Sequence, residues 1–229
     1  MPPGAPTPYS PVEAVKYGWT GFTRNVAPFL VLTIVMMVIG AAISVMTNLI
    51  TTGSVLGIQE YDSTPDVGEM LGMQAVSLGG SFISTLISWV IGMAMMRGAI
   101  DVVDTGRTEL GAMFSRINWG AALGAAVLGT LAIWVGIFAC IVPGLIIGFL
   151  LWFTSPAVID GESATGALSA SYRFTSGNVG DVLLFGLLAI VLIVIAVCTC
   201  GLATLVVSPV LSIGMAYTWR VLQGRPVAP

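Results

Sequence analysis

Long uncharged stretches rich in apolar residues alternate with short charged segments along this chain of 229 residues. The first two stretches, residues 27–50 and 71–96, are each long enough to cross a hydrocarbon core of ~30 Å as a helix. Residues 118–159 and 182–219 are also uncharged, and each is long enough for two such helices. We therefore expect an all-α protein with six transmembrane helices, arranged as three hairpins of the same orientation.

Two turns complete these hairpins. Pro143-Gly144 is the natural turn between a third helix at 119–141 and a fourth at 144–158, because both residues favour turns. A second turn is expected near residues 199–201, with Pro209 kinking the last helix. An alternative with four spans treats 144–158 and 202–219 as re-entrant segments, but only the six-span count places every cation on one side.

The basic residues give the expected orientation. All eight lie in alternate connections or beside the chain ends: Lys16, Arg24, Arg97, Arg107, Arg116, Arg173, Arg220 and Arg225. Positively charged loops stay in the cytoplasm, so both termini are expected there, in a bacterial cytoplasmic membrane. The expected organisation is a disordered Pro-rich tail at 1–9, a single six-helix membrane domain at 10–220 and a cytoplasmic tail at 221–229.

Composition supports a lipid environment and excludes several functions. Charged residues make up 8% of the chain and hydrophobic residues 56%, whereas a soluble domain has about 25% charged residues. The basic residues form no stripe that would bind nucleic acid. There is no His, which removes the commonest general base and metal ligand. Trp119, Trp152 and Trp219 fall near predicted helix ends, as in an interfacial aromatic belt.

The sequence repeats itself at a shift of 153 residues. Identical or similar residues then coincide before the first and fifth predicted spans, pairing Ser10 with Ser163, Trp19 with Tyr172 and Asn25 with Asn178. Ser10-Pro11-Val12-Glu13 has the form of a capping box, and Asp160 or Ser163 can cap the second copy. A looser copy ends at Asn118. Each hairpin is therefore expected to follow a helix that lies on the cytoplasmic surface.

A family resemblance rests on the segment 156–188. Its pattern consists of Pro156, Ile159, Asp160, Ala167, Ser171, Tyr172, Phe174, Gly177 and Asn178. The segment resembles the six-helix membrane domain attached to some glycerophosphodiester phosphodiesterases, and related stand-alone membrane proteins of actinobacteria-like bacteria whose function is unknown. This chain lacks the soluble phosphodiesterase domain. The resemblance therefore implies the fold and membrane residence, and it does not imply that activity.

Catalytic chemistry is not expected. No charged residue lies deep in a predicted span, where proton relays and ion-coupled carriers need one. At the surface, Asp101 and Asp104 are expected to pair with Arg97 and Arg107 along one helix. We predict no catalytic residue, no cofactor and no metal site.

Two sets of uncharged polar residues remain. Ser77, Ser81, Ser84 and Ser88 share one helix face, which either packs against another helix or lines a path for a lipid headgroup or another solute. Cys140 can form a disulfide with Cys198 or Cys200 if their hairpins are neighbours, or all three are free thiols facing lipid.

These observations predict a non-enzymatic structural or accessory subunit in the biogenesis or transport of cell-envelope lipids or lipoglycans. Its partners would be the lipid bilayer and another membrane protein, such as a transporter or glycosyltransferase, and not nucleic acid. The alternative is that the chain is itself a transporter or flippase-like protein for a lipid or another amphiphile.

Overall fold

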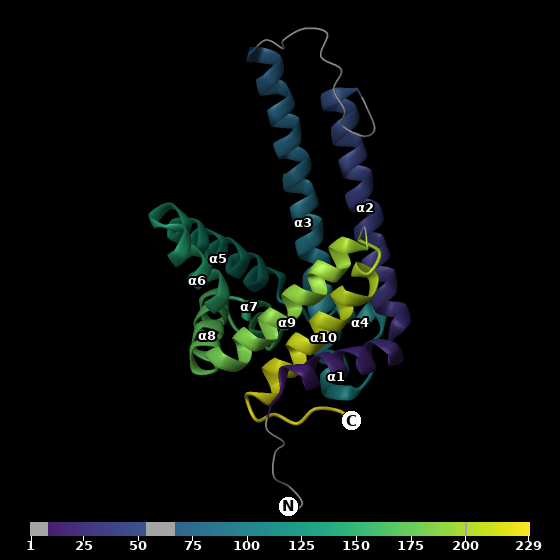
Figure 1. The fold of residues 1–229 in the computed structure, drawn as a ribbon, viewed down its shortest axis with the longest axis vertical. Helices are drawn as coiled ribbons and strands as arrows, with labels where there is room; N and C mark the ends of the chain where they lie inside the picture. Colours follow the sequence, from purple (N-terminus) through teal and green to yellow (C-terminus); the bar gives the residue numbers. More distant parts are fainter. Residues whose placement is uncertain (1–8, 54–66, 200) are drawn as a thin grey trace, which may run out of the picture. The chain divides into compact units, whose positions relative to one another are not determined.

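The computed structural model describes residues 9–53, 67–199 and 201–229, which form helices and connections without any strand (Figure 1). The all-α class is therefore confirmed for the described part of the chain. The helices are α1 Pro11–Arg24, α2 Val26–Thr52, α3 Val67–Thr105, α4 Leu110–Phe114, α5 Trp119–Ala139, α6 Ile141–Leu150, α7 Thr154–Ile159, α8 Ala164–Gly177, α9 Val179–Cys198 and α10 Thr204–Val221.

The chain divides into two compact units. The larger contains Met1–Leu30 and Met93–Pro229, and the smaller contains Val31–Gly92. The described residues of the smaller unit form most of α2 and the first two thirds of α3. The larger unit holds the other eight described helices.

Five segments are long and apolar enough to cross a membrane, so this is a membrane protein by length and composition. They are Val26–Thr52, Val67–Thr105, Trp119–Phe138, Ile141–Ile159 and Val179–Cys198. Helix α10, at the place of the sixth predicted span, is not among them. Most of its second half is buried, and it ends with the buried Trp219 and Arg220.

The turn between α5 and α6 differs from the predicted one. The chain reverses at Cys140, which is extended (φ −174°, ψ 148°), and α6 already begins at Ile141. Pro143 therefore lies in the first turn of α6, where its missing N–H has no helical partner to lose. Gly144 faces α5, and a Cβ there would stand 2.8 Å from the backbone nitrogen of Ile137. The glycine allows close helix contact and does not form the turn.

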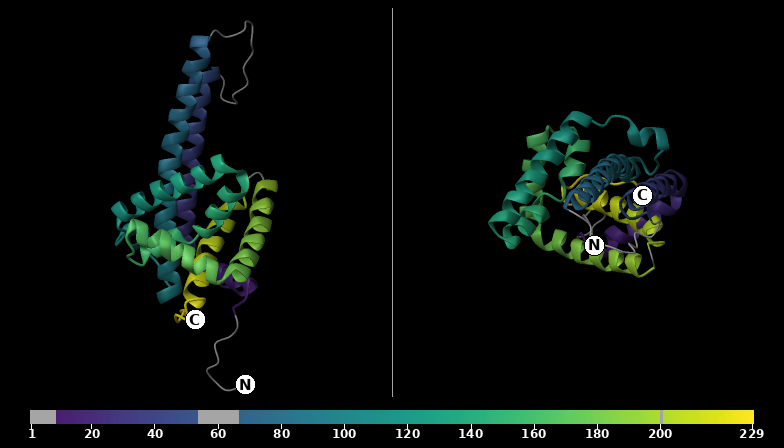
Figure 2. Two further views of the ribbon diagram at one scale, coloured as in Figure 1. Left: turned by 90° about the vertical axis from the view of Figure 1, so that its left-hand side faces the viewer. Right: turned by 90° about the horizontal axis from the view of Figure 1, so that it is seen from above.

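In the larger unit α1, α9 and α10 lie side by side (Figures 1 and 2). The contact between α1 and α10 depends on two glycines that bring the backbones together. A Cβ on Gly18 would overlap the carbonyl oxygen of Val210, and one on Gly214 would lie 3.1 Å from the carbonyl oxygen of Ala14. The two helices therefore touch through their main chains.

The two surface helices begin where the repeat predicted. Helix α1 follows Ser10 and α8 follows Ser163, and both are 14 residues long. The Ser163 hydroxyl accepts a hydrogen bond from the Gly166 N–H at 3.2 Å, whereas the Ser10 side chain makes no capping bond. The looser middle copy contains only the five-residue α4.

Candidate functional site

A polar groove lies between α2 and α3 in the smaller unit. Helix α3 contributes three of the predicted serines, Ser77, Ser81 and Ser84, while Ser88 is not among the residues that line the groove. Helix α2 contributes the hydroxyl groups of Ser44 and Thr47 and the amide of Asn48 on the opposite wall. The groove has a volume of about 360 Å³.

Small side chains create this groove. The α-carbon of Gly80 lies so close to Thr47 that a Cβ would overlap the threonine hydroxyl oxygen. One hydroxyl of the lining bonds to its own helix, because Thr85 Oγ1 donates to the Ser81 carbonyl at 2.8 Å. The lining includes no charged side chain. It can therefore receive a helix or headgroup by hydrogen bonding, but it has no group for acid–base chemistry.

A second polar cluster is centred on Arg220, near the end of α10. Its guanidinium donates through Nε and Nη2 to the two carboxylate oxygens of Asp104, each at 2.8 Å. Nη1 donates to both oxygens of Asp160 at 2.8 and 2.7 Å. Asp160 also accepts from Trp219 Nε1 at 2.8 Å and from Arg225 Nη1 at 3.0 Å. The side chain of Arg220 is only 6% exposed.

This cluster corrects two expectations. Asp101 pairs with Arg97 at 2.8 Å as predicted, but Asp104 pairs with Arg220 and not with Arg107. Trp219 is buried and packs on Phe153 and Phe174, with ring centroids 6.1 and 4.6 Å away, so it is no member of an interfacial belt. The guanidinium of Arg220 donates to carboxylates on both sides, so Arg220 links the ends of α3, α7 and α10. Its role is therefore structural.

The repeated asparagines form matching corners between a surface helix and the next long helix. Asn25 has φ −130° and ψ 39°, and Asn178 has φ −132° and ψ 36°. Each side-chain amide donates to the carbonyl four residues earlier, at Gly21 (3.0 Å) and Phe174 (2.8 Å). Asn25 additionally holds the connection after α3, because it donates to the Gly106 carbonyl at 3.1 Å and accepts from the Thr108 N–H at 3.0 Å.

The repeat extends to the buried face of each surface helix. Its four buried positions coincide at the shift of 153: Ala14 with Ala167, Gly18 with Ser171, Gly21 with Phe174, and Phe22 with Thr175. Trp19 and Tyr172 are likewise paired, and both are about half exposed (54% and 53%). The exposed aromatic positions therefore lie off the buried face in both copies.

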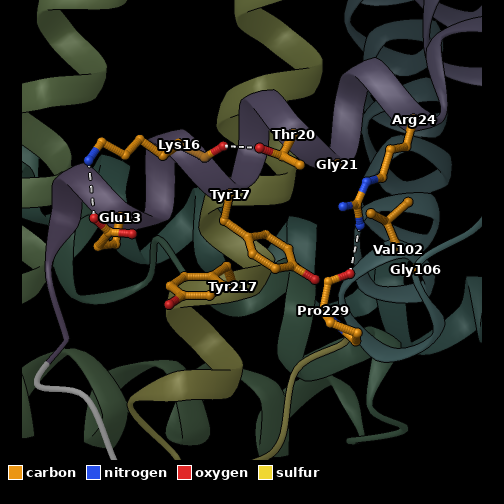
Figure 3. A pocket seen from close by; sticks show the side chains of 10 residues that line it. All are labelled: Glu13, Lys16, Tyr17, Thr20, Gly21, Arg24, Val102, Gly106, Tyr217 and Pro229. Carbon is orange, nitrogen blue, oxygen red and sulfur yellow. Dashed lines mark hydrogen bonds and ion pairs between the residues drawn. The ribbon is translucent and has the colours of Figure 1, made fainter.

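A hollow of about 220 Å³ between α1 and α10 is closed by the last residues of the chain (Figure 3). The rings of Tyr17 and Tyr217 lie 4.6 Å apart, and the Tyr17 hydroxyl donates to the Ala228 carbonyl at 2.8 Å. Arg24 Nη1 reaches the carbonyl oxygen of Pro229 at 2.7 Å. Burial raises the pKa of Tyr17, so this hydroxyl stays protonated and remains a donor. These contacts hold residues 228 and 229 against α1.

The remaining predicted site residues are cysteines. Cys140 and Cys198 are exposed free thiols in the structure, and Cys200 lies outside the described residues. The proposed disulfide thus stays a prediction. Within the described ranges no cluster of His, Cys, Asp or Glu could hold a metal ion.

Comparison with known proteins supplies relatives but no activity. The chain is 25% identical over 240 aligned residues to the uncharacterized protein Rv2560 of Mycobacterium tuberculosis, covering 99% of this chain and 74% of the relative. The same values hold for the uncharacterized protein Mb2590 of Mycobacterium bovis. No family model and no solved structure matches. The chain is therefore similar, over nearly its whole length, to mycobacterial proteins of uncharacterized function.

Proposed function

We propose that this chain is a non-enzymatic accessory subunit of the bacterial cytoplasmic membrane, acting in the biogenesis or transport of envelope lipids or lipoglycans. It would act by docking another membrane protein, such as a transporter or glycosyltransferase, through the polar groove of the smaller unit. That groove is the observation that carries the proposal. Close approach of small residues and hydrogen bonds between helices are what hold membrane helices together, and the groove offers both.

The groove suits a helix as its occupant. Gly40 lies on the α2 wall with nothing within 4 Å of its Cβ position, so a third helix can approach its backbone, whereas Gly80 is where α3 touches Thr47 of α2. Asn48 offers an amide that can hydrogen-bond across to the third helix. Acid–base catalysis at this place would need an ionisable group, which its lining does not include.

The proposed topology has six spans, in three hairpins of one orientation, each preceded by a surface helix. Helix α10 would be the sixth span, because its 18 residues extend about 27 Å, close to the hydrocarbon thickness. The positions of the cations favour both termini in the cytoplasm. This layout agrees with the six-helix membrane domain that residues 156–188 resemble, and we propose membership of that family.

Photo-crosslinking in cells tests the docking proposal. A photoreactive amino acid would replace Ser44 or Ser81 in the groove, with the sequence neighbours Val45 and Phe82, which do not line it, as matched controls. We expect one discrete protein adduct from the groove positions and none from the controls. A crosslink within the same chain, or equal adducts from all four positions, would disprove docking.

A second candidate is the transporter or flippase-like function, favoured by hydroxyl groups on both walls of an open groove. Such a path could shelter a lipid headgroup while the acyl chains stay in the bilayer. The purified chain in liposomes would then move a fluorescent lipid between leaflets, and Ser81→Leu with Ser84→Leu would slow it. If the chain is an accessory subunit, we expect no movement of the fluorescent lipid above that in protein-free liposomes.

A further inference from the structure

A charged hollow lies in the larger unit, between the end of α3 and the segment that follows it. It has a volume of about 290 Å³. Arg97, Asp101 and Thr105 line it from α3, and Arg107, Thr108 and Arg116 are among the residues that line it from the following segment.

The hollow has an excess of positive charge. Its lining contains three arginines against two carboxylates, those of Asp101 and Glu109. Asp101 is already bound by Arg97 at 2.8 Å. Within the described residues, neither Arg107 nor Arg116 forms an ion pair, so the guanidinium groups of both are available to an anion. Planar guanidinium groups match the oxygens of a phosphate in paired hydrogen bonds.

Two polar atoms of the lining are buried without a partner in the described structure. They are Nε of Arg97 and Oγ1 of Thr108. Buried polar groups are nearly always satisfied, so each requires an explanation. Both can donate a hydrogen bond to an anionic oxygen, and both belong to the same hollow.

The backbone around the hollow is held in place. Asn25 fixes Gly106 and Thr108 by hydrogen bonds, and Gly98 leaves room for the side chain of Met113, which presses α4 onto α3. Arg116 has φ 58°, the only positive φ of a non-glycine residue in the described structure. A side chain in this conformation costs about 1–2 kcal/mol, and such strain concentrates at functional sites. The hollow is therefore preformed.

We propose that this hollow binds a phosphate-bearing anion, supplied either by the headgroup of an anionic phospholipid or by free phosphate. Arg107 and Arg116 provide charge and paired donors, and the unpartnered Nε of Arg97 and Oγ1 of Thr108, which lie just beneath the surface of the hollow, join the contacts after a small side-chain movement. The site is independent of the polar groove, because the two share no residue.

Native mass spectrometry of the full chain in neutral detergent tests the proposal. Phosphatidylglycerol, phosphatidylcholine and inorganic phosphate are the three probes. We expect binding of phosphatidylglycerol, phosphate or both, with phosphatidylcholine at least several-fold weaker. Loss of phosphatidylglycerol on adding phosphate would show one shared site. Binding of phosphatidylglycerol that phosphate cannot displace assigns the headgroup, and binding of phosphate alone assigns the soluble anion.

Two variants separate binding from folding. Arg107→Gln with Arg116→Gln is expected to weaken binding on the order of tenfold, because charge-assisted hydrogen bonds are lost. The control, Lys16→Gln with Arg173→Gln, removes two cations outside the hollow and should change binding less than twofold. Thr108→Val should weaken binding without lowering thermal stability, since its hydroxyl has no partner to lose. Equal binding of both phospholipids with no phosphate bound, or equal losses in variant and control, would overturn the proposal.

Discussion

At the scale of single residues, Arg220 shows how a charge is held inside an apolar unit. Taking a guanidinium out of water is costly unless its donors are paired, and here two carboxylates accept from it. The two carboxylates are not equivalent. Asp160 is 15% exposed and serves three donor side chains, whereas Asp104 is 41% exposed. The more buried partner should therefore matter more.

Asp160→Asn should lower the free energy of unfolding by about 3 kcal/mol, because it leaves a buried guanidinium half unpaired. Asp104→Asn should cost about 1 kcal/mol, since water can reach that site. Thermal unfolding in detergent measures both. Glu13→Gln, which breaks an exposed pair with Lys16, is the control with almost no effect. Equal losses for Asp104 and Glu13 would contradict the role of burial.

Tyr9 gives a dependence on pH. Burial raises its pKa to about 12, and its hydroxyl shares a hydrogen bond of 2.9 Å with Thr218. An unfolded tyrosine ionises near pH 10, so its contribution to stability is complete below pH 10 and is lost as pH rises to about 12. Tyr9→Phe should therefore show a smaller fall in melting temperature over this interval. The same fall in both proteins would contradict the assignment to Tyr9.

At the scale of elements, signals from residues close together in sequence predicted the helix starts well. Contacts between residues far apart in sequence were not predicted. The start of α1 follows from Pro11 at its first position and the start of α8 from the Ser163 cap, and both signals act within four residues. The turn at Cys140 was missed because Pro143 is equally acceptable in a turn and in the first turn of a helix. The pair Asp104–Arg220 was missed because 116 residues separate its members.

The candidate site shows the same contrast between local and distant signals. Spacing along one helix brought Ser77, Ser81 and Ser84 together, but it could not supply the opposite wall from α2. The arginine hollow was also not expected, although its residues lie within 20 positions of one another. The backbone conformation of Arg116 and the hydrogen bond between Thr108 and Asn25 are what place the lining residues around one hollow.

The crossing of α1 and α10 gives a prediction at this scale. Gly18→Val should destabilise the larger unit by about 2–3 kcal/mol, because the added atoms overlap the Val210 carbonyl and push the helices apart. Gly180→Ala is the control, since nothing lies within 4 Å of its Cβ position and alanine favours helix. Its melting temperature should be unchanged or higher. A tolerated valine at 18 would show that the two backbones can separate freely.

At the scale of the whole molecule, the number of spans decides on which side of the membrane the C-terminus lies. Five spans put the two termini on opposite sides of the membrane, and six put them on the same side. A fluorescent protein fused after Pro229 should fluoresce, and alkaline phosphatase fused there should be inactive, if α10 is the sixth span. The reverse pattern would remove α10 from the spans. Fusions after Gly53 follow only one span, so they serve as a control that should give the opposite pattern: an active alkaline phosphatase and no fluorescence.

The position of Arg220 also sets an order for making the protein. At about 5–20 residues per second, the ribosome completes Asp104 roughly 6–20 s before it adds the arginine 116 residues later. During that time Asp104 has no Arg220 to neutralise it, and Asp160, made 60 residues before Arg220, lacks it for the later part of the interval. The hydrogen bonds that join the ends of α3, α7 and α10 can therefore form only after Arg220 has been added. Chains that stop before Arg220 leave the carboxylates of Asp104 and Asp160 without the guanidinium that joins the ends of α3, α7 and α10 in the folded unit.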